Sequence, residues 1–119
     1  MAVNLPSPGV GRAGTLGRMP VKLVVLYATP PDPAAFDQHY RDVHAPLASR
    51  LPGLQHFETS HFGAALDGGD LPYHLIAELT FADQGALEGA FASVEGQAAG
   101  ADYQQIAAPG SRMFVVQVD

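Results

Sequence analysis

The run at residues 21–27 constrains the fold more than any other stretch, because it is apolar at nearly every position. It reads Val-Lys-Leu-Val-Val-Leu-Tyr, and its β-branched residues favour a β-strand. A strand without a polar side belongs in a sheet that is covered on both faces. The fold must therefore provide helices for one face of the sheet and a further layer for the other.

Prolines end this strand and begin a helix. Residues 29–33 contain three prolines, and consecutive prolines cannot continue a strand ladder. Asp32 is suited to cap a helix and Pro33 to occupy its first turn, so the helix is expected to start there. Pro46 lacks an amide hydrogen, so we expect the helix to kink or break near Ala45 and to continue as a short second segment.

Hydrophobic periodicity gives this helix a buried stripe. At 3.6 residues per turn, His44 lies at the edge of the stripe, at the margin between core and solvent, where a pocket wall is expected. His39 lies on the opposite edge and diverges from His44 by about 140° on an α-helix. The expected members of the stripe are Phe36, Tyr40, Val43 and Leu47.

The remaining elements complete a βαββαβ order. Asp83 is a suitable cap for a second helix, whose stripe is Leu87, Ala90, Phe91 and Val94. Strands are expected at 54–63, 73–81 and 112–118, and helices at 84–94 and from there to about Asp102. This order predicts an α+β, ferredoxin-like fold with a four-stranded antiparallel sheet.

Two helices cover only one face of such a sheet. The other face also carries apolar side chains from the first strand, and a bare apolar face is unstable in water. Two subunits that pack together through their sheets solve this problem, with a cavity left between sheet and helices. The pattern therefore predicts a homodimer, paired as a dimeric α/β barrel.

Charge and composition exclude several classes of function. Twelve acidic residues against six basic ones give a net charge of -6, which argues against nucleic acid or an anionic membrane as a partner. The sequence has no cysteine and therefore no disulfide, and it has no stretch long and apolar enough to span a membrane. Residues 1–20 are an irregular Gly/Pro-rich arm without the apolar core of a secretory signal, so a cytoplasmic protein is expected.

Several motifs of residues 21–119 resemble the EthD family, which belongs to the dimeric α/β-barrel superfamily. The resemblance rests on Phe36, Tyr40, the His44-x-Pro46-Leu47 motif, the turn Leu51-Pro52-Gly53-Leu54 and the pair Glu78-x-x-Phe81. It implies a barrel pocket in which His44 is the pocket histidine and the strand face starting at Phe57 is part of the lining. Proteins with this barrel include lactone isomerases, polyketide cyclases and cofactor-free monooxygenases.

Two positions depart from the isomerase-like relatives. Those proteins have a tyrosine where this chain has Phe57, so a phenolic proton donor is missing there. They can also have a cysteine near the end of the third strand, where this chain has Leu79. Both departures count against lactone isomerisation.

The candidate catalytic residues are His44, as a general acid or base, and Tyr40, which would orient His44 or a substrate oxygen. A buried hydrogen bond for His44 and a core position for Tyr40 remain open as structural alternatives. Glu78 would serve either as a base in the cavity or as a solvated strand residue. The expected substrate-binding residues are Phe57, His61, Leu79, Phe81 and Tyr27.

The sequence offers no familiar pattern for a metal or a cofactor. The five histidines show no His-x-x-x-His or His-Glu-x-x-His spacing, so neither a metal site nor a cofactor is expected. The first functional hypothesis is an isomerase, cyclase or decarboxylase type of acid/base chemistry on a small organic catabolite or polyketide-like substrate. The second is a non-catalytic ligand-binding accessory protein for a neighbouring oxygenase system.

Overall fold

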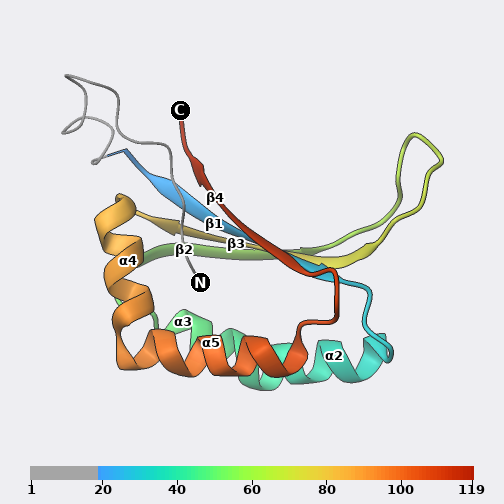
Figure 1. Cartoon of the computed structure of the whole chain (residues 1–119), viewed down its shortest axis with the longest axis horizontal. Coiled ribbons are helices and arrows are strands. Elements are labelled where there is room, and N and C mark those ends of the chain that lie inside the picture. The colour runs from blue at the N-terminus through green and yellow to red at the C-terminus, as the bar shows by residue number, and fades with distance from the viewer. Residues whose placement is uncertain (1–18) are drawn as a thin grey trace.

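The computed structural model describes residues 19–119 and consists of one sheet with helices on one side (Figure 1). The expected arm at 1–20 therefore lies outside the described residues, except for Met19 and Pro20. The strands are β1 (Val21–Ala28), β2 (Leu54–His61), β3 (Tyr73–Phe81) and β4 (Arg112–Gln117). The helical segments are α2 (Pro33–His39), η1 (Tyr40–His44), α3 (Ala45–Ser49), α4 (Gln84–Ala92) and α5 (Val94–Ile106).

The sheet has the strand order β2-β3-β1-β4, and its neighbouring strands are antiparallel. The order of elements along the chain is strand, helix, two strands, helices and strand, as the sequence patterns predict. The expected α+β, ferredoxin-like fold is confirmed. All the helices lie below the sheet in Figure 1, while the connection between β2 and β3 projects beyond its edge.

The core lies between the sheet and the helices. Along β1 the residues facing the helices, including Leu23, Val25 and Tyr27, are buried, and they pair with equally buried residues of β3. Phe81 and Leu87 are fully buried in the same cluster. Burial of these aliphatic and aromatic side chains is the main stabilising contribution to the domain.

The opposite face of the sheet carries no helix in the described part of the chain. Its central strand contributes Val24 and Leu26, which are only partly buried. Phe114 and Val116 of β4 are exposed on the same face, and Ile76 of β3 pairs with Leu26. This apolar surface is the one that the sequence pattern expects a second subunit to cover, and the homodimer stays a prediction.

The helix after β1 starts as expected, and the expected short second segment follows as α3 from Ala45, but a widened turn and not a break separates the two. The Asp32 side chain accepts a hydrogen bond from the Ala35 amide, and Pro33 is the first helical residue. From Tyr40 to His44 the backbone widens into a π-helix, in which the Ala45 amide donates to the Tyr40 carbonyl five residues earlier. An α-helix would need an amide hydrogen at Pro46 to bond the Asp42 carbonyl, and a wider turn just before the proline removes that requirement.

The wide turn changes which side chains are buried. Val43, predicted to be in the buried stripe, is 40% exposed, and Leu47 is only half-buried. His44, predicted at the margin, is only 6% exposed. A turn of the π-helix holds more than four residues, so positions four apart keep the same direction and positions three apart do not. The buried stripe is therefore Phe36, Tyr40, His44 and Ala48.

The second helical region is divided at Ser93. Ser93 ends α4 and caps α5 by accepting a hydrogen bond from the Gly96 amide, so Val94 is exposed instead of belonging to the buried stripe. A Cβ atom at Gly96 would lie 2.7 Å from the Phe91 carbonyl oxygen, which is closer than side chains tolerate. Glycine therefore lets α5 start directly against the end of α4. The helix also runs four residues beyond Asp102, the end expected from the sequence.

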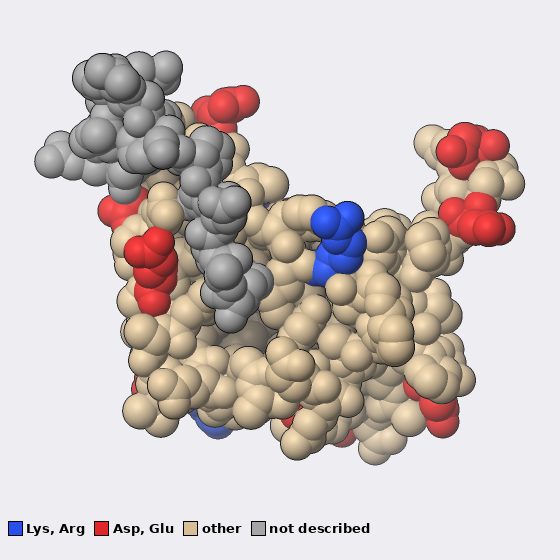
Figure 2. Space-filling model, in the orientation of Figure 1, with Lys and Arg blue, Asp and Glu red and all other residues tan. Residues whose placement is uncertain are grey.

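Figure 2 shows one face of the molecule as largely neutral, with acidic side chains at its edges and a basic patch near its centre. This distribution fits the acidic balance of the sequence. Within residues 19–119, no helix has the length and apolar character needed to cross a membrane.

Candidate functional site

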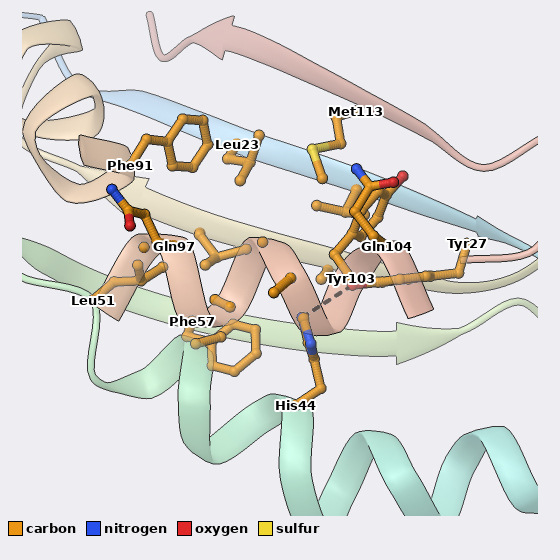
Figure 3. A pocket seen from close by; sticks show the side chains of 18 of the residues that line it. Leu23, Tyr27, His44, Leu51, Phe57, Phe91, Gln97, Tyr103, Gln104 and Met113 are labelled. Atoms are coloured by element: carbon orange, nitrogen blue, oxygen red, sulfur yellow. Dashed lines mark hydrogen bonds between the residues drawn. The ribbon is translucent and has the colours of Figure 1, made fainter. Parts of the chain in front are cut away.

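A cavity of about 640 Å³ lies between the helix-facing side of the sheet and the helical layer (Figure 3). Its sheet side is formed by apolar residues such as Leu23, Val25 and Leu79, and α5 contributes a long part of the opposite wall. This volume is in the range of pockets that hold small organic ligands. The lining is mostly apolar, and a group of polar side chains lies where η1, α5 and the end of β1 meet.

His44 is the centre of that polar group. Its Nδ1 lies 2.7 Å from Oδ2 of Asp102, and its Nε2 lies 3.3 Å from the Tyr27 hydroxyl. A carboxylate can only accept hydrogen bonds, so the Nδ1–H of His44 donates to Asp102. This leaves the Nε2 lone pair directed toward Tyr27, whose hydroxyl donates to it, as the dashed line in Figure 3 indicates. The bond to Asp102 thus fixes both the tautomer and the direction of the ring.

Asp102 belongs to α5, and its side chain is 9% exposed. Its second oxygen, Oδ1, accepts a hydrogen bond from His39 Nε2 at 2.7 Å. One carboxylate therefore binds two histidines that are five residues apart. The sequence expectation that His39 and His44 diverge was wrong, because the π-helix between them turns residues at this spacing toward the same side.

Sequence reasoning missed Asp102 as a site residue. It lies 58 positions from His44, and nothing local marks it as different from other acidic residues on helices. The one available signal was the composition of α5, where a single aspartate interrupts a stretch of small residues. A buried carboxylate is costly without partners, so its two hydrogen bonds explain why the fold tolerates it there.

Burial is the main influence on the charge of His44. It disfavours the imidazolium, and the nearby His39 acts in the same direction, while Asp102 opposes both. The net result is that the pKa of His44 is lowered from its ordinary value of 6.5. At neutral pH the side chain is therefore a neutral imidazole. Its Nε2 lone pair, which accepts the hydrogen bond from Tyr27, is the position that can take up a proton.

Tyrosine side chains surround Nε2 of this imidazole. The Tyr27 ring contacts Tyr40 edge-on with centroids 5.5 Å apart, and the Tyr40 and His44 ring centroids are 5.0 Å apart. Burial raises the pKa of Tyr27, with Tyr40 and Tyr103 acting in the same direction, and burial also raises the pKa of Tyr40. Both hydroxyls stay protonated over the physiological range and can serve as hydrogen-bond donors.

Five of the seven residues singled out from the sequence line the cavity, and two do not. Those that line it are His44, Tyr40, Tyr27, Phe57 and Leu79. His61 is exposed at the edge of the sheet, where it hydrogen bonds to Asp37, and it lies outside the lining. Phe81 lies on the helix-facing side of the sheet, as the cavity does, but it is fully buried in the core and does not line the cavity.

Glu78 is not a base in the cavity. Its neighbours Ala77 and Leu79 are buried against the helices, so side-chain alternation directs Glu78 to the uncovered face of the sheet. There it forms an ion pair with Lys22, with 3.5 Å between Nζ and Oε2. The solvated reading of Glu78 is the correct one.

The structure also adds lining residues that the sequence did not suggest. Gln97 and Gln104 of α5 are polar members of the wall, and Phe91 and Met113 close the cavity on the side of α4 and β4 (Figure 3). The result is an apolar cavity with one acid/base group and a few hydrogen-bonding positions. That composition suits a small, mostly apolar ligand with an oxygen function.

Comparison with known proteins identifies similar chains. The model of the EthD domain family matches residues 29–110. An uncharacterised 11.0 kDa protein in the thcB–thcC intergenic region of Rhodococcus erythropolis is 37% identical over 93 residues, which cover 78% of this chain and 89% of that protein. An EthD-family protein from Bacillus halodurans superposes with a TM-score of 0.79 at 32% identity, covering 85% of this chain and 100% of that one.

More distant solved structures share the fold alone. A hydroxynitrile lyase from Passiflora edulis has a TM-score of 0.71 at 9% identity, covering 86% of this chain and 95% of its own. SnoaB, a cofactor-independent oxygenase from Streptomyces nogalater, has a TM-score of 0.63 at 16% identity, covering 83% and 92%. A dimeric ferredoxin-like protein of unknown function from Bacteroides fragilis has a TM-score of 0.62 at 12% identity, covering 83% and 96%.

Proposed function

Because this chain belongs to the EthD family, we propose that its cavity binds a small, mostly apolar organic molecule and that His44 transfers a proton on it. The observation that carries this proposal is the Asp102–His44–Tyr27 arrangement at the wall of the cavity. A neutral, oriented imidazole in an apolar cavity can act as a general base, and the lowered pKa of His44 keeps it in the unprotonated form that this role needs. The chemistry is of the isomerase, cyclase or decarboxylase type.

The proposed step is removal of a proton from the carbon next to a carbonyl group. The Nε2 lone pair of His44 forms the new N–H bond, and the electron pair of the broken C–H bond becomes the C=C bond of an enolate. The Tyr27 hydroxyl, which lies beside Nε2, donates a hydrogen bond to the enolate oxygen. Asp102 stabilises the resulting imidazolium, and return of the proton to another atom of the substrate completes the turnover.

The fold is compatible with such chemistry in other proteins. Its distant neighbours include a hydroxynitrile lyase and a cofactor-independent oxygenase. Their similarity to this chain is limited to the fold, so the reaction is inferred from the residues of this cavity. Small organic catabolites and polyketide-like compounds with a carbonyl group match its size and lining.

The uncovered face of the sheet supports a second part of the proposal, a homodimer that completes a dimeric α/β barrel. Val24, Leu26, Phe114 and Val116 form an apolar surface of the kind that subunit interfaces cover. A dimeric ferredoxin-like neighbour is consistent with this mode of assembly. Phe114→Asp is expected to convert a dimer into a monomer in analytical ultracentrifugation, whereas a wild-type monomer would contradict the assembly.

The mostly apolar lining favours one alternative, a binding protein that sequesters a hydrophobic metabolite for a neighbouring oxygenase. In that case His44 only contributes a hydrogen bond to the ligand. The two functions differ in what His44 does to a bound molecule, and hydrogen–deuterium exchange into the ligand separates them.

The test uses the full chain in D₂O with a panel of small ketones, lactones and aromatic diketones, followed by proton NMR. Wild-type protein is expected to accelerate exchange at the carbon next to the carbonyl for at least one compound. His44→Gln keeps a polar side chain of similar size and is expected to lower the exchange rate by at least ~10²-fold. His56→Gln is the matched control, since His56 lies on β2 outside the cavity lining, and should retain exchange.

Binding is measured in the same samples by saturation-transfer difference NMR. Binding without exchange would identify the ligand-binding alternative. Exchange that persists in His44→Gln would contradict the role of His44, and a panel without any binder would contradict both functions for this class of compound.

A further inference from the structure

We propose that Asp37, His61 and His74 form a binding site for a divalent first-row transition-metal ion. Their potential ligand atoms, one from each side chain, all lie within 4.8 Å of one another. None of the three lines the cavity around His44, so this would be a second site with a different chemistry. The inference is independent of the proposed function.

The geometry around Asp37 is convergent. His74 Nε2 lies 2.7 Å and His61 Nε2 lies 3.0 Å from the same oxygen, Oδ1 of Asp37. The two imidazole rings meet nearly edge-to-face, with centroids 5.0 Å apart. Two nitrogens therefore approach one carboxylate oxygen, and three potential ligand atoms are gathered within 4.8 Å of one another.

The three ligands come from three different elements, α2, β2 and β3, which the fold brings together at one end of the sheet. A bulge in β3 directs His74 toward the helices: Tyr27 pairs with Leu75 and Ala28 with Tyr73, so His74 has no partner on β1. Its ring then packs against Phe36 of α2, with centroids 5.5 Å apart. Regular alternation would have turned His74 to the uncovered face of the sheet.

The donor set fits a transition metal better than a hard cation. Imidazole nitrogens bind Zn²⁺, Cu²⁺, Ni²⁺ and Fe²⁺ well, and a carboxylate completes a set of two histidines and one acid that recurs in such sites. Two ligand atoms on a tetrahedral zinc ion are about 3.3 Å apart, given metal–ligand distances of about 2.0–2.1 Å. The present separations from Asp37 need only a small outward movement to match this value.

The chemistry of the side chains also suits a cation. Asp37 supplies the acidic ligand, and neutral imidazoles supply the other two once each ring carries its proton on Nδ1. His61 is 58% exposed, which leaves an open approach for the ion and a position for water.

The spacing rules applied to the sequence consider histidines along one helix, whereas these ligands are 24 and 37 positions from Asp37. A site assembled from a helix and two strands therefore left no trace in the sequence. Asp102 also binds two histidines, but each of them contacts a different oxygen of the carboxylate. Their nitrogens therefore do not converge on one point.

The test is isothermal titration calorimetry of the chelator-treated full chain with Zn²⁺, supported by the visible absorption of Co²⁺. Wild-type protein is expected to bind one ion per chain, and His61→Ala, His74→Ala and Asp37→Asn to weaken binding at least tenfold. His56→Ala is the matched control, since His56 is on the same strand as His61, is similarly exposed at 67%, and lies 4.0 Å from its nearest acidic partner, Glu58. His44→Gln should also bind normally, which separates this site from the cavity.

Two results would overturn the proposal. One is the absence of stoichiometric binding to wild-type protein. The titration for this result extends to the ion concentrations at which wild type and His56→Ala both begin to bind nonspecifically. The other is binding that His61→Ala and Asp37→Asn leave unchanged. Because His61 is exposed, His61→Ala should fold normally, and circular dichroism of this variant keeps loss of binding distinct from loss of structure.

Discussion

Two clusters of the same composition, one aspartate with two histidines, lie at different depths in this molecule. The Asp102 side chain is 9% exposed, and its two oxygens each accept one hydrogen bond, from His39 and from His44. The Asp37 side chain is 36% exposed, and a single oxygen accepts both of its histidines. Identical residue types therefore produce one divergent arrangement in the core and one convergent arrangement near the surface.

The clusters also differ in the ring nitrogen that one histidine uses. His44 donates through Nδ1 and directs Nε2 toward Tyr27 at the cavity wall. His39, His61 and His74 all direct Nε2 at their carboxylate. The first arrangement orients a base toward a ligand, and the second gathers ligands around a point. Burial adds to the contrast because it lowers the pKa of His44, while the pKa of Asp37 is lowered by its two partners. We expect acid/base chemistry at the first cluster and metal binding at the second.

Substitution of each aspartate by asparagine should produce the largest effects and distinguish the functions of the two clusters. Asp102→Asn replaces an acceptor by an amide and frees His44 to adopt the wrong tautomer. It should reduce exchange at the substrate carbon by roughly 10²- to 10⁴-fold. Asp37→Asn should leave that exchange rate unchanged while abolishing stoichiometric Zn²⁺ binding, and Asp102→Asn should bind Zn²⁺ normally. A loss of both properties in either variant would contradict the division of roles.

Gly96 offers a way to disturb only the buried cluster, because α5 carries Asp102. Gly96→Ala places a methyl group against the carbonyl oxygens of Ala90 and Phe91, and the helix has to move. Overpacking of this kind costs about 1–3 kcal/mol of unfolding free energy, measurable by urea denaturation. Gly89→Ala in α4 is the control, since no atom beyond the local helix backbone lies within 4 Å of the added methyl group and an alanine favours the helix. Equal stability of the two variants would show that α5 is not held tightly against α4.

Acidification should weaken the fold through His44, which is the smallest of the expected effects. The pKa of His44 in the folded state is lowered below its unfolded value, near 6.5. Above pH 7 both states are neutral and stability is independent of this group. As the pH falls below about 6.5, the unfolded chain binds a proton that the folded state refuses, so the unfolding free energy decreases until the folded pKa is passed.

The control for this pH dependence is His44→Gln, which should show a shallower decrease of stability between pH 7 and 5. The Asp37 carboxylate acts in a different pH range. Its pKa is also lowered, so its contribution to the unfolding free energy is lost only as the pH falls below about 3.8. Identical profiles for wild type and His44→Gln would contradict a lowered pKa of His44.

The layout of the fold was readable from local signals. Asp32 with Pro33 and Asp83 mark helix starts because capping acts over three or four residues, and alternation along residues 73–81 gives the third strand with its correct bounds. The apolar run at 21–27 placed a strand at the centre of the sheet. Each of these signals depends on neighbours in the sequence.

The site was only partly readable because two irregularities change the direction of side chains. The π-helix before Pro46 moves His44 from the margin into the core and turns His39 to the same side. The bulge in β3 turns His74 from the uncovered face of the sheet toward the helices. Regular periods of 3.6 and 2 cannot anticipate an extra residue, and the partner of His44 comes from a helix 58 positions away.

The central claim is that His44 is a neutral, oriented base at neutral pH, and heteronuclear NMR of its imidazole tests this most directly. Spectra of ¹⁵N-labelled protein that correlate ring nitrogens with carbon-bound protons distinguish the tautomers and follow their titration. We predict the Nδ1–H tautomer at pH 7 and a pKa below 6.5, with Asp102→Asn losing the tautomer preference. An imidazolium at pH 7, or a proton resident on Nε2, would contradict the account.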